Sequence, residues 1–171
     1  ISYRLVGSEM CIRDSYISMI PSLITGEKGF LARTYLNLYK ESNTRPLTYN
    51  RYTNYFYEEL NHNLIEPHQI IHSGACSSRY SIGINTYKDN HSSLLKLVEF
   101  VKSRPKCRII YISANSIGSS EYTSKFSELY SYLKYQGELH IKSTLSPHQY
   151  AIIRLPACLL YTSDAADDLY R

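Results

Sequence analysis

The sequence predicts an α/β fold built on a doubly wound parallel sheet. Short apolar segments alternate along the chain with longer segments in which apolar residues recur at helical spacing. A turn that contains two glycines joins the first apolar segment to the first helical one. Strands that alternate with helices in this way are typical of parallel βαβ units, whose helices cover both faces of one sheet.

The expected elements follow one another as strand and helix through most of the chain. The strands are short apolar runs, expected at residues 19–25, 46–49, 69–73, 108–113 and 151–155. The first helix begins at Phe30 and fades over residues 41–44, and the others are expected at 52–64, 88–102 and 122–140. Residues 108–113 (RIIYIS) form the clearest strand, while Leu94, Leu97 and Val98 mark one helical stripe.

The composition limits the class of protein. A chain of 171 residues with 43% hydrophobic and 20% charged residues is typical of a single globular domain. No apolar run approaches the roughly 20 residues of a membrane span, so we expect no membrane partner. The net charge is +4 for the whole chain and about +6 for residues 16–157, which have 16 basic and 10 acidic residues. This charge suits an anionic ligand, but the scattered basic residues disfavour nucleic-acid binding. Four cysteines without CxxC spacing predict free thiols and a cytoplasmic protein.

Both ends of the chain are expected to lie outside the fold. Residues 1–15 and 158–171 resemble translated sequencing-adapter sequence, and the resemblance rests on the strings MCIRDS and LLYTSDAADD. Segments of this kind are not part of a native fold, just as residues left by an expression vector are not. Residues 16–157 are then expected to form one domain.

The turn after the first strand has the features of a phosphate-binding turn. Gly26 can adopt the tight turn, Gly29 allows the backbone to approach a pyrophosphate, and Ala32 permits close packing of helix on strand. Phe30 and Leu31 lie at the helix N-terminus, whose N–H groups and partial positive charge favour an anion. An ordinary glycine turn is the alternative, but the strand, turn and helix context favours a nucleotide site.

The residues after the second strand bear on the choice of cofactor. A carboxylate about 20 residues beyond the glycine turn ordinarily binds the ribose hydroxyls of NAD. Asn50 and Arg51 occupy this region, so no carboxylate repels a 2′-phosphate and a guanidinium can pair with one. The sequence therefore favours NADP over NAD, unless both residues belong to an ordinary surface loop.

A tyrosine and a lysine four residues apart suggest acid/base chemistry. Tyr130 and Lys134 share one face of a predicted helix, and an ammonium near a phenol lowers the phenol pKa. Ser113 closes the clearest strand and is expected to offer its hydroxyl to a substrate carbonyl, with Asn115 and Ser116 as local alternates. In a chain with 18 tyrosines the pair alone could be an ordinary solvated helix face.

Five strings together resemble the extended short-chain dehydrogenase/reductase family, of the NAD-dependent epimerase/dehydratase type that acts on nucleotide sugars. They are TGEKGFLA at 25–32, IIHSGA at 70–75, IIYISANSIG at 109–118, YSYLKYQGE at 130–138 and IIRLP at 152–156. The resemblance implies a Rossmann-like fold that binds NAD or NADP, with Ser113, Tyr130 and Lys134 as the catalytic triad. It also implies that Gly74, Ala75 and Pro156 lie against the cofactor, and that Lys134 contacts its ribose.

The sequence departs from the family pattern in several places. A third strand is not evident between Gly26 and Gly74, and neither Asn85 nor Asn90 fits the position of the family's asparagine on the central helix. The chain ends after residues 151–155, which correspond to the sixth strand in the family's order, so the fold is expected to be incomplete at its C-terminus and to lack the sugar-binding portion. His72 precedes Gly74 at a strand end, where we expect a packing role.

These observations favour an NAD(P)-dependent reductase or epimerase of a nucleotide-linked sugar, active in polysaccharide precursor synthesis. The expected partner is the nucleotide-sugar substrate, with a homodimer as an open option. A non-catalytic NAD(P)-binding sensor or scaffold of the same fold is the alternative, and a flavodoxin-like domain without nicotinamide binding is a third. No pairing of the six histidines at metal spacing suggests a metal site.

Overall fold

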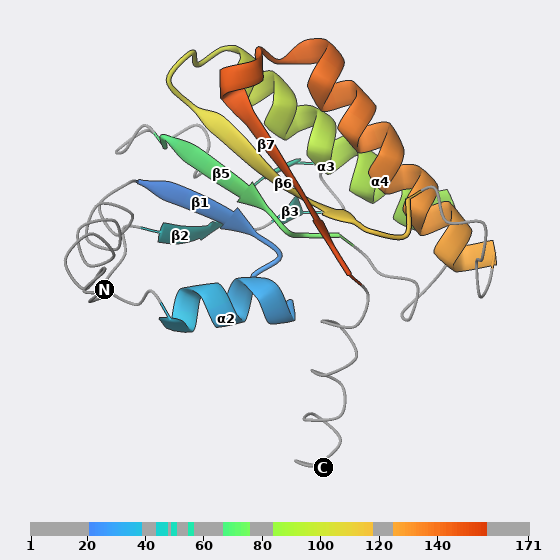
Figure 1. Cartoon of the computed structure of the whole chain (residues 1–171). Coiled ribbons are helices and arrows are strands. Elements are labelled where there is room, and N and C mark those ends of the chain that lie inside the picture. The colour runs from blue at the N-terminus through green and yellow to red at the C-terminus, as the bar shows by residue number, and fades with distance from the viewer. Residues whose placement is uncertain are drawn as a thin grey trace, which may run out of the picture.

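A computed structural model describes residues 21–38, 44–47, 49–50, 55–56, 67–75, 84–117 and 125–156. Five parallel strands form one sheet in the order β2-β1-β5-β6-β7 (Figure 1). Their bounds are β1 (Ser22–Thr25), β2 (Thr44–Leu47), β5 (Gln69–His72), β6 (Arg108–Ala114) and β7 (Tyr150–Leu155). The predicted α/β fold with a parallel sheet is confirmed.

Helices cover both faces of the sheet. Helix α2 (Phe30–Leu38) lies on one face, and helices α3 (Ile84–Lys102) and α4 (Lys125–Thr144) lie side by side on the other (Figure 1). A short 3-10 helix, η2 (Pro147–Gln149), leads into β7. Each of these three helices was expected from its apolar spacing, and the sheet is therefore doubly wound, as predicted.

The alternation of side chains along the strands explains the two covered faces. Leu23 and Ile70 belong to the larger core beneath α3 and α4, whereas their neighbours Ile24 and Ile71 pack with Ala32 of α2. Successive residues of a strand point to opposite faces, so a strand that is covered on both sides is apolar at consecutive positions. This is why the central strands read as continuous apolar runs.

The prediction for residues 52–64 was wrong where the structure describes them. Instead of a helix, β4 (Tyr55–Phe56) pairs antiparallel with β3 (Tyr49–Asn50) as a small second sheet. Tyrosine and phenylalanine favour strands, and the mixed spacing of the aromatic residues gave no strong helical period. The rest of that range lies outside the described residues, as do the tails at 1–15 and 158–171.

The order of strands creates a crevice at one end of the sheet. From β1 the chain passes through α2 to β2 on one side, and from β5 it passes through α3 to β6 on the other. The connections after β1 and β5 therefore leave these neighbouring strands in opposite directions. Ligands of open α/β sheets bind outside the carboxyl ends of the strands at such a switch point.

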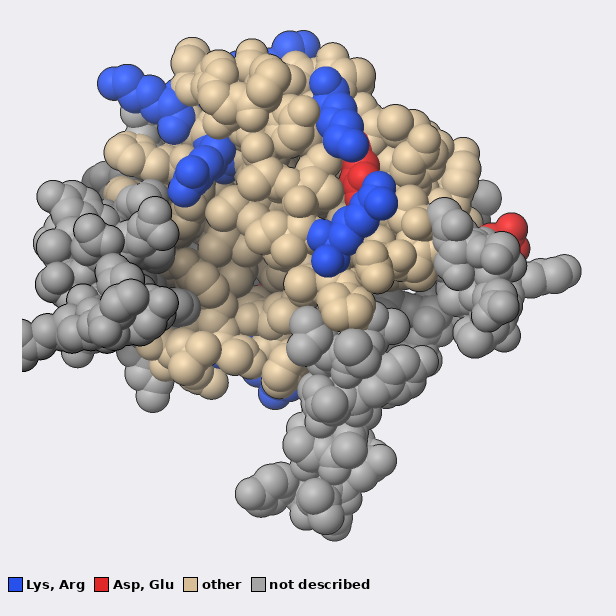
Figure 2. All heavy atoms as spheres, viewed as in Figure 1, with Lys and Arg blue, Asp and Glu red and all other residues tan. Residues whose placement is uncertain are grey.

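The surface and the helices show two further properties. Lys and Arg side chains on the face shown in Figure 2 lie in several separate places. Among the helices within the described ranges, none is both long enough and apolar enough to span a bilayer.

Replacement of Gly26 by alanine tests the packing at the switch point. Gly26 has a φ of 78°, and a Cβ there would lie 2.6 Å from the Gly74 Cα. The left-handed backbone and the clash together should lower the free energy of unfolding by about 3 kcal/mol. At Gly29 a Cβ would meet only the Gly26 carbonyl oxygen, at 3.1 Å, so Gly29→Ala should cost less than about 1 kcal/mol. Urea unfolding measures the free energy of unfolding of both variants. Equal losses of stability in the two variants would contradict the close packing of Gly26 against Gly74.

Candidate active site at the switch point

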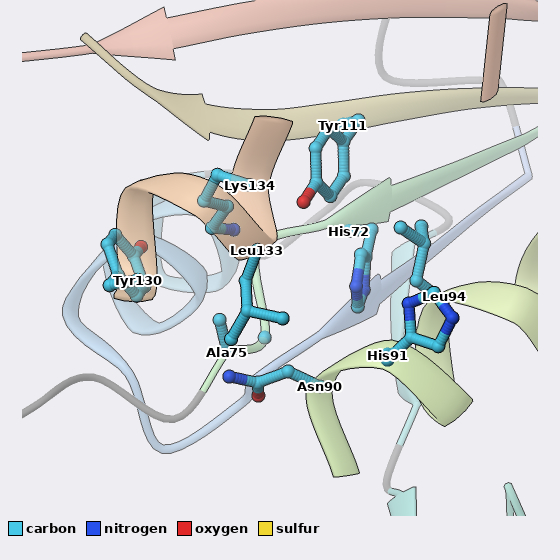
Figure 3. Close-up of a pocket in the computed structure, with 10 residues that line it drawn as sticks. His72, Ala75, Asn90, His91, Leu94, Tyr111, Tyr130, Leu133 and Lys134 are labelled. Carbon is cyan, nitrogen blue, oxygen red and sulfur yellow. The ribbon is translucent and has the colours of Figure 1, made fainter. Parts of the chain in front are cut away.

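A pocket lies between β5, β6, α3 and α4, next to the switch point (Figure 3). Its wall combines two small residues after β5 with aromatic, imidazole, amide and amine groups from the flanking elements. The lining residues are His72, Gly74, Ala75, Asn90, His91, Leu94, Tyr111, Tyr130, Leu133 and Lys134. Four of the residues predicted from the sequence, Gly74, Ala75, Tyr130 and Lys134, thus line one pocket.

The backbones of Gly26 and Gly74 touch at the base of this region. A Cβ on Gly74 would lie 2.9 Å from the Gly26 nitrogen, so neither position has room for a side chain. Hydrogen bonds fix the contact: the Gly74 N–H donates to Thr25 Oγ1 at 2.9 Å, and Ser73 Oγ donates to the Thr25 carbonyl at 2.6 Å. The ends of β1 and β5 are therefore held together at a point where neither segment carries a side chain.

The glycine turn leads directly into α2. The Gly29 N–H donates to the Gly26 carbonyl at 2.8 Å, and the helix begins at Phe30. Ala32 is fully buried in the core beneath α2, in line with the small residue expected there. Phe30 is exposed and Leu31 half-buried at the helix N-terminus. The first N–H groups of a helix lack intrahelical partners, which makes this end suitable for a phosphate.

Lys134 lies between two phenol rings. Its Nζ is 5.6 Å from the centroid of the Tyr130 ring and 4.8 Å from that of Tyr111 (Figure 3). The same Nζ donates a hydrogen bond to the carbonyl of Ile112 at 2.7 Å, and the side chain is 4% exposed. The expected proximity of Tyr130 and Lys134 is therefore present.

Burial sets the protonation of this pair. It raises the pKa of Tyr130 to about 12 and lowers the pKa of Lys134 to about 8. The expectation of a phenol made more acidic is wrong for the free protein, because desolvation disfavours the phenolate and the ammonium hydrogen-bonds to a carbonyl. At neutral pH, Tyr130 is a neutral phenol and most of Lys134 is protonated.

Ser113 lies outside the pocket lining. Its side chain is buried, and its hydroxyl donates to Glu138 Oε1 of α4 at 2.7 Å. Ser116, one of the alternates, shares a 2.7 Å hydrogen bond between its Oγ and that of Ser131, and Asn115 is exposed. The structure thus brings two members of the expected triad into the pocket and directs the third toward α4.

The buried carboxylate of Glu138 binds exposed cations in a charge network that sequence reasoning missed. Arg154 donates to both carboxylate oxygens at 2.8 Å, and Lys142 Nζ lies 3.9 Å from Oε2. Hydrogen bonds from Arg154 and Ser113 and the nearby cations hold the pKa of Glu138 below its usual value, against the opposing effect of burial. Its position four residues after Lys134, on the same helical face, was the available signal.

Asn90, His91, Tyr111 and Leu133 also line the pocket without having been predicted. Asn90 reaches the pocket from α3 (Figure 3), and its misfit to the position of the family's asparagine stays a prediction. Asn90 lies one helical turn before the buried Leu94, on the same face of α3. Extending that face toward the helix N-terminus would have indicated Asn90 from the sequence.

Asn50 and Pro156, which were predicted to contact the cofactor, are not among the residues that line this pocket. Asn50 lies in β3, and Arg51 lies outside the described residues. Pro156 follows β7 and is exposed, while the Leu155 carbonyl accepts a hydrogen bond from the Asn115 N–H at 3.0 Å. Their predicted roles toward a cofactor remain predictions.

Comparison with solved structures supports the fold. ADP-L-glycero-D-manno-heptose-6-epimerase from Helicobacter pylori has a TM-score of 0.60 and 16% identity, over 81% of this chain and 55% of that one. The Bordetella bronchiseptica enzyme WbmH, solved in complex with NAD+, has a TM-score of 0.58 and 15% identity, over 81% and 56%. The aureusimine biosynthetic cluster reductase domain has a TM-score of 0.57 and 19% identity, over 81% and 50%.

The chain thus spans about half the length of each of these three structures. No family model and no curated protein sequence matches it. At these identities the similarity establishes the shared Rossmann-like fold and leaves the chemistry to the residues of the site.

Stability at low pH tests the charge network around Glu138. The folded-state pKa of Glu138 lies below its unfolded value, so its contribution to stability is present above about pH 4.3 and is lost as the pH falls through the folded pKa. The free energy of unfolding of Glu138→Gln should be about 1–3 kcal/mol below wild type at pH 7. It should also fall less steeply than wild type from pH 5 to 3. Glu128→Gln, at an exposed position of the same helix, should keep the wild-type slope; identical slopes for all three proteins would contradict the network.

Proposed function

We propose that the chain is the cofactor-binding unit of an NAD(P)-dependent reductase or epimerase of the extended short-chain dehydrogenase/reductase family. One observation carries the proposal: Tyr130 and Lys134 line the same pocket as Gly74, whose backbone touches the glycine turn at Gly26. Acid/base groups and a phosphate-type turn are thereby placed next to each other at the switch point of a doubly wound sheet.

The residues present fit a dinucleotide. A Cβ at Gly26 or Gly74 would fill the contact between β1 and β5, and the turn ends at the N-terminus of α2. Gly26, Gly29 and the first residues of α2 would hold the pyrophosphate, and Gly74, Ala75 and Lys134 would contact the remainder. When bound, a nicotinamide cofactor supplies or accepts hydride.

The protonation of the free site suits the reduction of a carbonyl. Reduction of a carbonyl requires a proton on the developing alkoxide, and the neutral phenol of Tyr130 can donate it. The Lys134 ammonium, 5.6 Å from that ring, then stabilises the phenolate that forms. The proposed role of Ser113 as a donor to the carbonyl requires its hydroxyl to exchange Glu138 for the substrate.

The proposed substrate is a sugar linked to a nucleoside diphosphate, in polysaccharide precursor synthesis in the cytoplasm. The printed description of the Helicobacter pylori neighbour as an ADP-heptose epimerase supports this class through the shared fold. The chain covers 55% of that neighbour, so the sugar specificity belongs to the proposal and rests on no described residue. NADP is the favoured cofactor because of Asn50 and Arg51.

One observation favours the alternative of a non-catalytic NAD(P)-binding protein. The Ser113 hydroxyl is buried against Glu138 and Ser113 is not among the pocket-lining residues. A sensor or scaffold needs the glycine turn and the pocket but has no use for a carbonyl-polarising hydroxyl. Cofactor binding without turnover of any sugar nucleotide would favour this alternative.

Replacement of Tyr130 tests the catalytic proposal. In a full-length parent that carries the sugar-binding portion as well, Tyr130→Phe removes the proton donor and should reduce NADPH oxidation with a panel of nucleotide-linked keto sugars by about 10²–10⁴-fold. Tyr132→Phe is the matched control, because Tyr132 is 52% exposed on the same helix and should leave the rate unchanged. Near-normal turnover by Tyr130→Phe would defeat the assignment.

Calorimetry tests the cofactor preference. Wild type should bind NADP+ several-fold more tightly than NAD+, and Arg51→Ala should remove the difference, since the guanidinium pairs with the 2′-phosphate. The preference should also weaken as salt is raised. Tighter binding of NAD+ by wild type would refute the role of Arg51.

A further inference from the structure

His72 is a buried imidazole at the end of β5 that the proposed proton chemistry does not use. It is 3% exposed, lines the pocket, and stacks on Tyr111 with 5.7 Å between ring centroids and an interplanar angle of 19° (Figure 3). Its Nδ1 lies 2.8 Å from Thr25 Oγ1. The hydrogen bond at Nδ1 and the stacking on Tyr111 fix the orientation of the ring. They therefore also fix the direction of the other ring nitrogen, Nε2.

The hydrogen bonds around Thr25 determine which ring nitrogen carries the proton. Thr25 Oγ1 already accepts the Gly74 N–H, at 2.9 Å. Thr25 is itself buried, and a buried hydroxyl hydrogen requires an acceptor. Within the described residues, His72 Nδ1 is the recorded acceptor within reach of this hydroxyl. Nδ1 therefore accepts, and the ring proton resides on Nε2.

The other ring nitrogen is available to a ligand. Across the described part of the chain, no hydrogen bond is recorded between Nε2 and another protein atom. In those ranges, the fully buried side-chain atoms without a partner do not include His72 Nε2. Since Nε2 has no partner there, it is accessible, and we take it to face the pocket that His72 lines. Burial and the nearby Lys134 ammonium lower the pKa of His72 to about 3, which keeps the ring neutral at physiological pH.

We infer that His72 is a ligand-binding residue that presents its Nε2–H to the pocket as a hydrogen-bond donor for an oxygen atom of the bound dinucleotide. The inference rests on the proposed function and adds to it a residue for which sequence reasoning predicted only packing. Thr25 acts as a positioning residue, because the same hydroxyl binds the backbone of Gly74 and fixes the tautomer of His72. The Thr25 side chain thereby links the contact between Gly26 and Gly74 to His72 in the wall of the pocket.

Nitrogen NMR of ¹⁵N-histidine-labelled chain tests the tautomer directly. We expect the His72 signals, assigned by their loss in His72→Phe, to show a neutral ring protonated at Nε2 from pH 6 to 8. Addition of NADP+ should shift Nε2 more than Nδ1, and Thr25→Val should produce a mixture of tautomers while Thr25→Ser preserves the wild-type form. A ring protonated at Nδ1, or one that is cationic at pH 6, would overturn the inference.

Calorimetric titration with NADP+ tests the contact with the ligand. His72→Phe keeps a ring against Tyr111 but removes the donor, and its affinity should fall about tenfold. His68→Phe, at an exposed histidine just before β5, is the matched control and should bind as wild type does. Wild-type affinity in His72→Phe would overturn the inference alone. Absence of NADP+ and NAD+ binding by wild type would overturn the proposed function, and the inference with it.

Discussion

The contact between the backbones of Gly26 and Gly74 is the constraint on which the site depends. It is possible only because both residues lack a Cβ, and three hydrogen bonds that involve Thr25 hold it in place. The contact sets β1 directly beside β5 at the point where the connections diverge. It therefore places the glycine turn, the start of α2 and the residues after β5 around one crevice.

Burial gives this crevice its chemical character. Tyr130, Lys134 and His72 all lie in surroundings that disfavour their charged forms, so the phenol is a weaker acid and the amine a weaker base than in water. The nearby carboxylate of Glu138 accepts hydrogen bonds from both Ser113 and Arg154. A site of this kind favours neutral hydrogen-bond donors and suits the donation of a proton to a developing alkoxide.

The fold could be predicted because the strands contain short apolar runs, with β1 and β5 buried on both faces, and because the helices carry apolar residues at helical spacing. The strands at β1, β5, β6 and β7 follow directly from apolar runs between turn residues. The hairpin of β3 and β4 could not be predicted in this way, since two-residue strands have no measurable period. The pairing of β3 with β4 depends on contacts with the rest of the fold, and the local sequence pattern does not indicate it.

The site was predicted in part, for physical reasons that can be named. Sequence spacing puts Tyr130 and Lys134 on one helical face, and strand-end glycines mark the crevice. Spacing does not reveal that Ser113 finds a buried carboxylate twenty-five residues later, or that desolvation outweighs the ammonium at the phenol. Nor does it reveal the tautomer of His72, which depends on a hydroxyl 47 residues away in the chain.

The most direct test of the central claim is an NMR titration of ¹⁵N-glycine-labelled chain, whose seven glycines give few signals, with NADP+ and NAD+. A dinucleotide bound at the switch point should shift the amides of Gly26, Gly29 and Gly74 together, along one saturable binding curve. Saturable binding that leaves these three amides unmoved would place the ligand elsewhere and contradict the site.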